Sequence, residues 1–374
     1  MGRQTVAIIG GGIGGLTTAL ALLRQGVDCA VYERAPELHE IGSGVGLWPN
    51  AMRVLDRVGV GDDVRALSGQ WAISGVRNQA GALLNGFSVT EYSQRFGEPL
   101  VGVHRGELQM TLKAALPDGV LHTGRECVGV EATGDRVKVR FVDGDPVVAP
   151  VVIAADGIRS VIRRSLFVDK PLRDLGMLGW RATLVDPPDT GGFTGEIWGN
   201  GASFGFLPMG SNRLSWFGGA DGDPPRTKEF LAERFAEWHA PIPELIERTD
   251  ESMIWFDRLY DTWPRRHWVK GRVALLGDAA HPMSPFLGMG ACQAILDAWV
   301  VAEELARTTD DVAGLMRYQR RRWPLASAVQ LAAHGGVMSA RPRPNVVQPL
   351  FETSLRIVPK ALMLRGLTLL GRGV

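Results

Sequence analysis

The sequence predicts an α/β protein with two parts, a domain built on a parallel sheet and a domain built on an antiparallel sheet, followed by helices at the C-terminus. Three observations predict this fold class. A strand, a glycine-rich turn, a helix and a second strand follow one another at the start of the chain. Two later apolar strands end in Asp156-Gly157 and Gly277-Asp278. Much of the sequence between those two strands alternates apolar and polar residues, as antiparallel strands do.

Composition narrows the class of protein. The 374 residues exceed what one core usually organises, so two intimate domains are expected. A net charge of +1 gives no reason to expect nucleic-acid binding. The three cysteines lie far apart without metal-ligand spacing, which predicts no metal site and fits a reducing cytoplasm. We expect neither a secretory signal nor a transmembrane helix, because no apolar run reaches about 20 residues.

The N-terminal unit is the clearest functional signal. Residues 5–25 supply the strand, the turn and the helix, and the second strand ends at Glu33. Gly10 allows a tight turn, Gly12 lets a pyrophosphate approach the backbone, and Gly15 lets helix and strand pack closely. The helix N-terminus favours phosphate, and Glu33 can accept hydrogen bonds from a ribose. The unit therefore predicts a Rossmann-like dinucleotide site, which by itself fits FAD or NAD.

Later segments extend this site. Three alternate glycines within residues 42–46 suggest a loop whose backbone passes close to a ligand. Arg105 starts a helix and could pair with a phosphate, or be an ordinary surface charge. Asp156-Gly157 ends one buried strand. Gly277-Asp278 ends another, and a second glycine turn follows it and enters a helix at Gly290, whose N-terminus could hold a phosphate or the electron-rich edge of a flavin. Each turn could arise by chance, but their joint order and spacing favour one ligand site.

Together these motifs resemble the class A flavoprotein monooxygenases with the p-hydroxybenzoate hydroxylase fold, over about residues 5–330. The AHPMSP sequence at 280–285 and GACQAILDA at 290–298 add to the resemblance, and the length is most similar to the salicylate hydroxylase branch. The resemblance implies FAD as cofactor, NADH or NADPH as a transient reductant, and O2 and a small aromatic molecule as substrates. It also implies that a flavin C4a-hydroperoxide transfers one oxygen atom to an electron-rich ring.

The resemblance further implies how the cofactor is held. Glu33, with Arg34 beside it, binds the adenosine ribose, and Asp278 binds the ribityl chain. Asp156 and Arg159 serve both FAD and the docking of NAD(P)H. The complete expected set of FAD-binding residues is Gly10, Gly12, Ile13, Gly14, Gly15, Glu33, Arg34, Gly46, Arg105, Val128, Asp156, Arg159, Asp278, Pro285, Gly288, Gly290 and Ala291.

The substrate is expected to meet the alternating segment. We predict a discontinuous FAD-binding domain that comprises residues 1–73, 103–169 and 270–330. The substrate domain comprises residues 74–102 and 170–269, and a C-terminal helical segment comprises residues 331–374. Aromatic residues in strands usually belong to a core, so each pocket assignment competes with that alternative. Arg181 is the only charge expected near the pocket and is a weak catalytic candidate. The candidate pocket residues are Trp180, Arg181, Trp198, Phe204, Phe206, Trp216 and Met289.

Two departures from the family pattern bear on the substrate. Relatives usually carry Gln at the position of Met289, and a methionine cannot donate a hydrogen bond to a substrate carbonyl. Hydroxybenzoate and hydroxynicotinate relatives carry His and Tyr in the strand that corresponds to Ser203–Leu207, where this chain has no ionisable group. A phenol-activating base is therefore not evident. We expect a mainly apolar ring that is already electron-rich, such as an indole, a quinolone or a polycyclic phenol.

Some alternatives stay open at this stage. Arg341-Pro-Arg-Pro344 ends a helix, and Ser354–Leu370 is expected to form a basic, apolar helix. This helix would pack on the FAD-binding domain or, as the less favoured alternative, contact a membrane surface. The enzyme could also be an epoxidase, a Baeyer–Villiger enzyme or a non-oxygenating reductase. A further alternative is a catalytically idle FAD protein that stabilises a substrate or partner.

Overall fold

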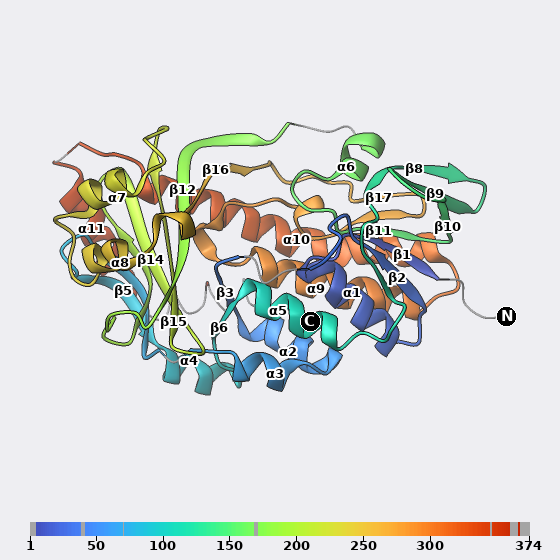
Figure 1. Cartoon of the computed structure of the whole chain (residues 1–374), viewed down its shortest axis with the longest axis horizontal. Coiled ribbons are helices and arrows are strands. Elements are labelled where there is room, and N and C mark those ends of the chain that lie inside the picture. The colour runs from blue at the N-terminus through green and yellow to red at the C-terminus, as the bar shows by residue number, and fades with distance from the viewer. Residues whose placement is uncertain are drawn as a thin grey trace.

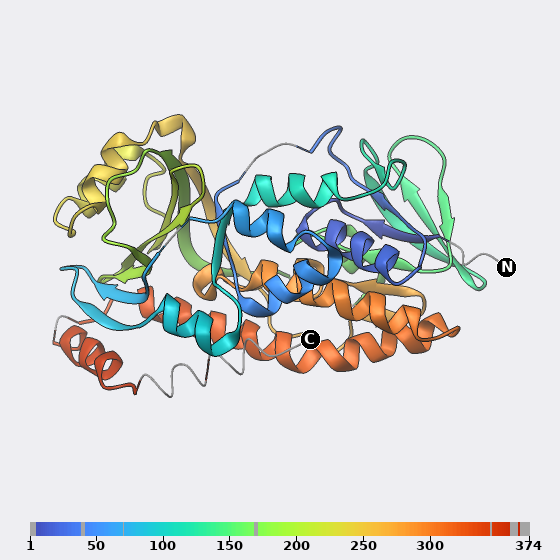
Figure 2. The ribbon, with the colours of Figure 1, turned by 90° about the horizontal axis from the view of Figure 1, so that it is seen from below.

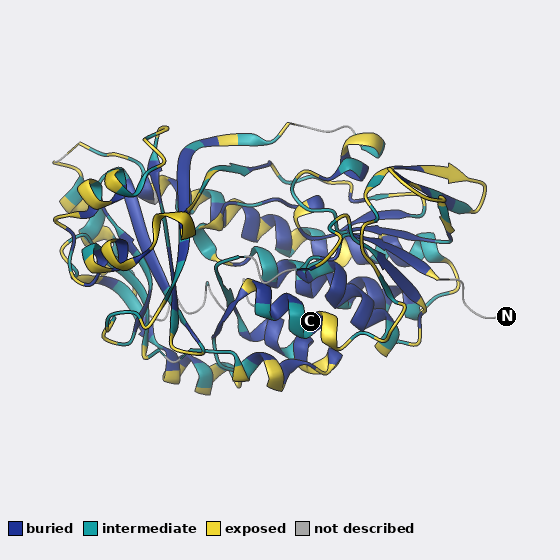
Figure 3. Ribbon diagram, viewed as in Figure 1, coloured by how far each residue is buried: buried dark blue, intermediate teal, exposed yellow. Residues whose placement is uncertain are grey.

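The computed structural model describes residues 5–38, 42–69, 71–167, 171–344, 346–359 and 366. Figure 1 shows an elongated molecule with a parallel sheet towards one end and a largely antiparallel sheet towards the other. This arrangement confirms the predicted mixed α/β class. Strands, α1 and α9 carry most of the buried residues, while loops and outer helix faces are exposed (Figure 3).

The parallel sheet has six strands in the order β17-β18-β11-β1-β2-β7, and only the β17–β18 pair is antiparallel. All four residues of β1 are buried, because helices or strands cover both faces of a parallel sheet. Its strands come from separate parts of the chain. They are β1 (Val6–Ile9), β2 (Cys29–Tyr32), β7 (Leu121–His122), β11 (Val152–Ala154), β17 (Val269–Lys270) and β18 (Val273–Leu275).

Helices and two small sheets surround this parallel sheet. Helix α1 packs closely on α9, and α9 packs in turn on α10 (Figure 1). The helices are α1 (Ile13–Arg24), α2 (Pro49–Val58), α3 (Gly61–Ala66), α5 (Arg105–Ala114), α6 (Val161–Leu166), α9 (Gly290–Ala306) and α10 (Asp311–Val337). The small sheets pair β3 (Gly44–Leu47) with β6 (Val101–His104), and join β8 (Cys127–Thr133), β9 (Arg136–Phe141) and β10 (Val147–Ala149).

The second large sheet has seven strands in the order β16-β12-β15-β14-β13-β4-β5, of which only β13 and β4 run parallel. Helices α7 (Lys228–Phe235) and α8 (Ile242–Arg248) cover its outer face (Figure 2). The strands are β4 (Ile73–Asn78), β5 (Leu83–Ser88), β12 (Arg173–Val185), β13 (Phe193–Trp198), β14 (Ala202–Met209), β15 (Arg213–Asp221) and β16 (Trp255–Asp261); α4 (Val89–Phe96) follows β5.

The C-terminal helices differ from the prediction. Helix α11 spans Gln348–Arg356 and packs on the β4–β5 side of the antiparallel sheet, not on the parallel-sheet domain. Asn85 Nδ2 donates to the Leu355 carbonyl at 2.9 Å, and the rings of Trp198 and Phe351 stack. Most of the rest of the expected 354–370 helix lies outside the described residues. Among the helices that the structure describes, none has the length and apolar character needed to cross a bilayer.

Short 3-10 helices complete the described chain: η1 (Glu251–Met253), η2 (Gly277–Ala279), η3 (Pro285–Leu287) and η4 (Met338–Ala340). Two of them, η2 and η3, lie between β18 and α9 and therefore at the carboxyl end of the parallel sheet, where ligands of such sheets bind.

Candidate functional site

The first glycine turn has the close contacts that its sequence predicts. Gly10 has φ of +111°, and a Cβ atom on it would lie 2.3 Å from the Ala155 carbonyl oxygen. A Cβ on Gly15 would lie 1.9 Å from the Gly10 carbonyl oxygen. A Cβ on Gly12 would meet no described atom within 4 Å. Gly10 and Gly15 are therefore required for packing, whereas Gly12 faces open space at the start of α1.

Glu33 is fixed beside this turn at the end of β2. Its Oε2 accepts a hydrogen bond from the Gly11 N–H at 2.6 Å, and its Oε1 accepts one from the Ala35 N–H at 2.9 Å. Gln109 of α5 donates to the Gly11 carbonyl at 2.7 Å. The carboxylate is thus oriented next to the open space at Gly12, where a ribose would reach it.

Two opposite charges lie at the start of α5 and in η2, and the region between them, the Gly10–Gly15 turn and the start of α9 is called the hollow below. Arg105 is the first residue of α5 and Asp278 belongs to η2, and both side chains are accessible although protein atoms surround them. This burial raises the pKa of Asp278, while His281 and Arg105 oppose the shift. Burial lowers the pKa of Arg105, which Asp278 counteracts and Arg181 reinforces. Arg105, Asp278 and Arg181 therefore lie within electrostatic reach of one another.

Backbone segments form the other walls of the hollow. Neither Gly46 in β3 nor Gly288 before α9 has a described atom within 4 Å of an added Cβ. The Cys292 thiol of α9 donates to the Gly46 carbonyl at 3.5 Å and so fastens β3 to α9. No side chain among the described residues caps the N-terminus of α9, which leaves the N–H groups around Gly290 and Ala291 available.

Asp156 has a partly structural role. Its Oδ2 accepts from the N–H groups of Val161 and Ile162 at 2.9 and 3.2 Å, so it caps the start of α6. Its Oδ1 is buried and has no hydrogen-bond partner in the described part of the chain. Burial raises the pKa of this carboxyl against these hydrogen bonds. Oδ1 is therefore left without a partner among the described residues, while Arg159 nearby is exposed.

The remaining expected cofactor residues lie next to the hollow or on the protein surface. Ile13 and Gly14 belong to α1, and a Cβ on Gly14 would meet the Leu276 side chain at 2.8 Å. Arg34 is exposed after β2, and Val128 is exposed on β8. Pro285 starts η3.

A buried ionic network supports the hollow and was missed by the sequence reasoning. Asp297 of α9 accepts hydrogen bonds from His281 Nε2 at 2.6 Å, Arg322 Nε at 2.7 Å and the Gly277 N–H at 3.0 Å. Although burial opposes it, the charges of His281 and Arg322 hold the pKa of Asp297 below its ordinary range. Buried Arg163 also donates to two consecutive carbonyls within η2, those of Asp278 and Ala279. An acid within the otherwise apolar stretch of residues 294–302 was the available sequence signal for Asp297.

Four of the predicted pocket residues are wrong. Trp180, Phe204, Phe206 and Trp216 belong to the core that the sheet forms with α7 and α8. The rings of Phe204 and Trp216 stack at 5.4 Å, and Phe204 also meets Phe235 of α7. Because side chains alternate along a strand, these residues point away from the parallel-sheet domain. Met289 is buried at the start of α9.

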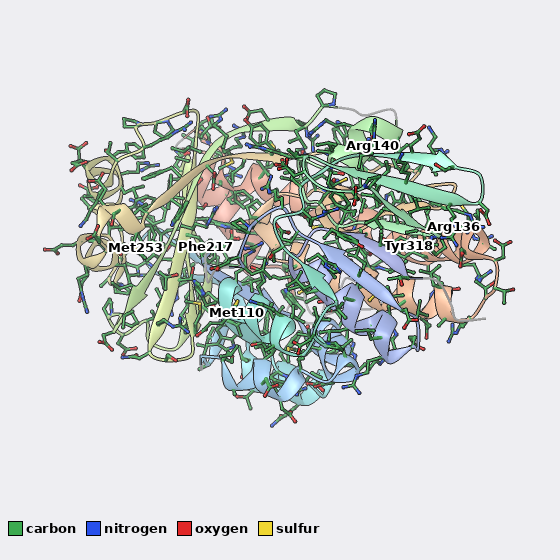
Figure 4. All side chains as sticks on the ribbon, turned by 45° about the vertical axis from the view of Figure 1, so that its right-hand side comes forward. Met110, Arg136, Arg140, Phe217, Met253 and Tyr318 are labelled. Carbon is green, nitrogen blue, oxygen red and sulfur yellow. The ribbon has the colours of Figure 1, made fainter. Side chains whose placement is uncertain are left out.

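The inner face of the sheet carries the alternate residues. Leu207 contacts the positions where Cβ atoms of Gly44 and Gly102 would lie, in β3 and β6. Phe217 lies on the same inner face of β15 (Figure 4). Arg181 of β12 pairs with Phe217 across the strands and forms an ion pair with Asp257 at 2.8 Å. Trp198 of β13 also points inwards, where its ring stacks on Phe351. The inner face therefore closes the hollow opposite the glycine turns.

The hollow suits FAD. Three features of it match a dinucleotide flavin: an open glycine turn at a helix N-terminus, a fixed acid beside it, and a second uncapped helix N-terminus further along the hollow. Comparison with known families agrees, since the model of an FAD-binding domain matches residues 3–333.

Similar proteins cover nearly the whole chain. The aurachin C monooxygenase/isomerase of Stigmatella aurantiaca is 39% identical over 326 residues, 85% of each chain. The 6-hydroxynicotinate 3-monooxygenase of Bordetella bronchiseptica is 31% identical, over 89% of this chain and 91% of that protein. Among solved structures, Klebsiella pneumoniae HpxO complexed with FAD and uric acid has a TM-score of 0.90 at 28% identity, covering 98% and 97% of the two chains.

Proposed function

The chain belongs to the family of FAD-binding aromatic monooxygenases, and we propose that it uses NADH or NADPH and O2 to hydroxylate an electron-rich, mainly apolar aromatic or polycyclic ring. The balanced reaction is RH + O2 + NAD(P)H + H⁺ → ROH + H2O + NAD(P)⁺. The cofactor FAD, held in the hollow described above, supplies the electron transfer and the activation of O2.

The apolar inner face of the sheet is the observation that carries this proposal. Phe217, Leu207 and Leu259 provide apolar surface, and the Phe217 and Leu259 side chains lie over Gly205 and Gly179, where added Cβ atoms would be 2.6 and 2.7 Å away from them. Leu259 also packs near Phe286 of η3, which lies next to the uncapped start of α9. A flat apolar ring could pack against such a surface, near the uncapped start of α9 where the flavin would be held. The relatives named for hydroxynicotinate and urate also act on planar rings.

The protein's own contribution is to bind, orient and exclude water. The turn at Gly10–Gly15 and the α9 N-terminus would hold the two ends of the cofactor. Arg105 and Asp278 place one positive and one negative group beside it, and the network around Asp297 keeps η2 in position. The antiparallel sheet would then cover the substrate ring and keep water from the reacting atoms. Exclusion of water favours oxygen transfer to the substrate over release of the activated oxygen as peroxide.

Oxygen incorporation tests the proposal. The purified holoenzyme is mixed with NADH or NADPH and a panel of indoles, quinolines, naphthols and hydroxybenzoates under 18O2. We expect compound-dependent NAD(P)H oxidation and a product that gains one 18O atom, best with the larger apolar rings. Catalase in a parallel reaction reports uncoupled peroxide. NAD(P)H oxidation without 18O incorporation would instead favour a reductase. If no compound stimulates NAD(P)H oxidation, the result favours a catalytically idle FAD protein. Coupled turnover mainly with small hydroxybenzoates would refute the proposal that the substrate is a mainly apolar ring.

A further inference from the structure

One row of side chains crosses four strands of the antiparallel sheet on its inner face. Arg181 of β12 lies opposite Phe217 of β15, Phe217 opposite Gly205 of β14, and Gly205 opposite Glu196 of β13. Residues that lie directly opposite in antiparallel strands point to the same face. Arg181 interacts electrostatically with Arg105 of the cofactor hollow. The row therefore begins at the hollow and ends at Glu196.

The middle of this row is formed by Phe217, whose side chain is partly accessible. The Phe217 ring covers Gly205, because a Cβ added to Gly205 would lie 2.6 Å from Phe217 Cε2. Neighbouring strands are about 4.8 Å apart, so Glu196 lies roughly two strand spacings from Phe217. A planar molecule packed on the accessible side of the Phe217 ring could thus present its edge to the Glu196 carboxyl.

Glu196 has an unusual environment for a carboxyl group. Its Oε2 accepts a hydrogen bond from Trp198 Nε1 at 2.6 Å, which is its only hydrogen bond within the described part of the chain. No ion pair to Glu196 occurs among the described residues. The side chain is surrounded by protein atoms yet still partly accessible, as Arg105 and Asp278 are in the hollow. Oε1 is therefore free to meet a ligand that enters from the inner face.

We propose that Glu196 recognises an N–H or O–H group on the edge of the substrate ring and accepts its proton during the reaction. This inference rests on the proposed function, and it adds a donor group to the otherwise apolar ring expected there. In the proton transfer, the N–H or O–H bond breaks, its electron pair stays on the ring heteroatom, and the proton bonds to Oε1. The added negative charge delocalises into the ring and makes the carbon to be hydroxylated more nucleophilic.

The electrostatic surroundings suit this role. Burial raises the pKa of Glu196 to about 7, against the hydrogen bond from Trp198, so carboxyl and carboxylate coexist near neutral pH. The neighbouring strand positions on β14 and β4 carry no charge: Gly205 lies on one side and Val76 on the other.

The charged groups of α11 and of the segment before it interact with residues other than Glu196. Glu352 of α11 accepts a hydrogen bond from Asn78, and it also pairs with Arg356 at 3.8 Å. The Arg343 guanidinium lies 3.7 Å from the centroid of the Phe351 ring. Oppositely charged groups that would hold Glu196 permanently ionised are therefore not observed in the described segments.

Paired ligands test the assignment by binding. The holoenzyme is titrated with 1-naphthol against 1-methoxynaphthalene and with 4-hydroxyquinoline against 4-methoxyquinoline, with the flavin absorbance as the signal. We expect each hydroxy compound to bind at least about tenfold more tightly than its methoxy partner above pH 7, since the methyl group removes a charge-assisted hydrogen bond. The preference should fall as the pH drops below about 6 and Glu196 becomes protonated. Equal affinity within each pair, at every pH, overturns the proposal.

Variants separate recognition from folding. Glu196→Gln should abolish both the preference and its pH dependence, and kcat/KM for the hydroxy compounds should fall by about 100-fold, the lower range for a lost general base. Glu196→Asp should restore part of both. Glu244→Gln, on α8 beyond the other face of the sheet, is the matched control and should behave like the wild type. A Glu196→Gln variant that keeps its FAD and the preference refutes the assignment.

The two proposals fail in different ways. Wild-type protein that shows the pH-dependent preference but incorporates no 18O would overturn the proposed function and support Glu196 as the recognition residue. Conversely, 18O incorporation without any preference for hydroxy over methoxy compounds supports the hydroxylase and overturns the role of Glu196.

Discussion

Replacement of Asp297 by Asn should destabilise the whole cofactor domain. Asp297 is fully buried, and its two oxygens accept from His281, Arg322 and the Gly277 N–H. An asparagine has the same shape but only one acceptor oxygen, so its NH2 group must face a donor. Arg322 is 1% exposed and would keep its charge without a counter-charge. Breaking a buried ion pair on one side typically costs about 3–5 kcal/mol, which is the loss expected here.

Urea unfolding of the FAD-loaded protein, followed by tryptophan fluorescence, measures this loss. Asp62→Asn is the matched control, because Asp62 pairs with Arg65 at 3.0 Å but is fully exposed. It should unfold at nearly the wild-type midpoint. Because the folded pKa of Asp297 is lowered, its stabilisation is present above the unfolded value of about 3.9 and is lost as the pH falls through the lower folded pKa. The gap between wild type and Asp297→Asn should therefore shrink below about pH 4.

The same variant should bind FAD more weakly, because the Gly277 N–H that Asp297 holds belongs to the turn carrying Asp278. Flavin retained after gel filtration reports this. An Asp297→Asn protein that unfolds at the same urea concentration as Asp62→Asn refutes the reasoning.

Two further pairs of variants separate packing from ligand contact. Gly15→Ala would place a Cβ 1.9 Å from the Gly10 carbonyl oxygen, so we expect about 1–3 kcal/mol of destabilisation and loss of bound FAD, seen by absorbance. Gly335→Ala, in α10 with no described neighbour within 4 Å, should be neutral or stabilising by up to about 1 kcal/mol, and equal behaviour of the two would contradict the packing argument. Phe204→Ala should cost about 3–5 kcal/mol of stability while substrate preference stays unchanged. Phe217→Ala should change KM or product coupling more than stability, and steady-state kinetics showing the reverse order would move the substrate to the other face.

The cofactor turn was predictable because its determinants are local. Gly10 and Gly15 meet backbone atoms a few residues away in the same unit or in the next parallel strand, and only glycine fits those contacts. Glu33 likewise follows from its place at the end of a strand beside the turn. Asp297 was not predictable as a buried anion, because its partners His281 and Arg322 lie 16 and 25 residues away in the chain.

The pocket was assigned to the wrong face for a physical reason. Alternation along β14 separates Phe204 and Phe206 from Gly205 and Leu207, but the sequence does not tell which set faces the helices. Both faces of this sheet are covered, one by α7 and α8 and the other by the parallel-sheet domain, so both carry apolar residues. The size of a side chain does not indicate that it lines the pocket, because the larger aromatic residues of this sheet fill the core under α7 and α8.

The same register bears on the proposed role of Glu196. A search confined to Ser203–Leu207 finds no ionisable group, yet Gly205 of that strand lies directly opposite Glu196 of the next. The glycine at this position lets the Phe217 ring lie across β14, because a Cβ there would lie 2.6 Å from Phe217 Cε2. The absence of an acid on one strand and its presence on the neighbour are therefore parts of one arrangement. The substrate that we propose on this basis is apolar across its face and carries a hydrogen-bond donor at the edge that would meet Glu196.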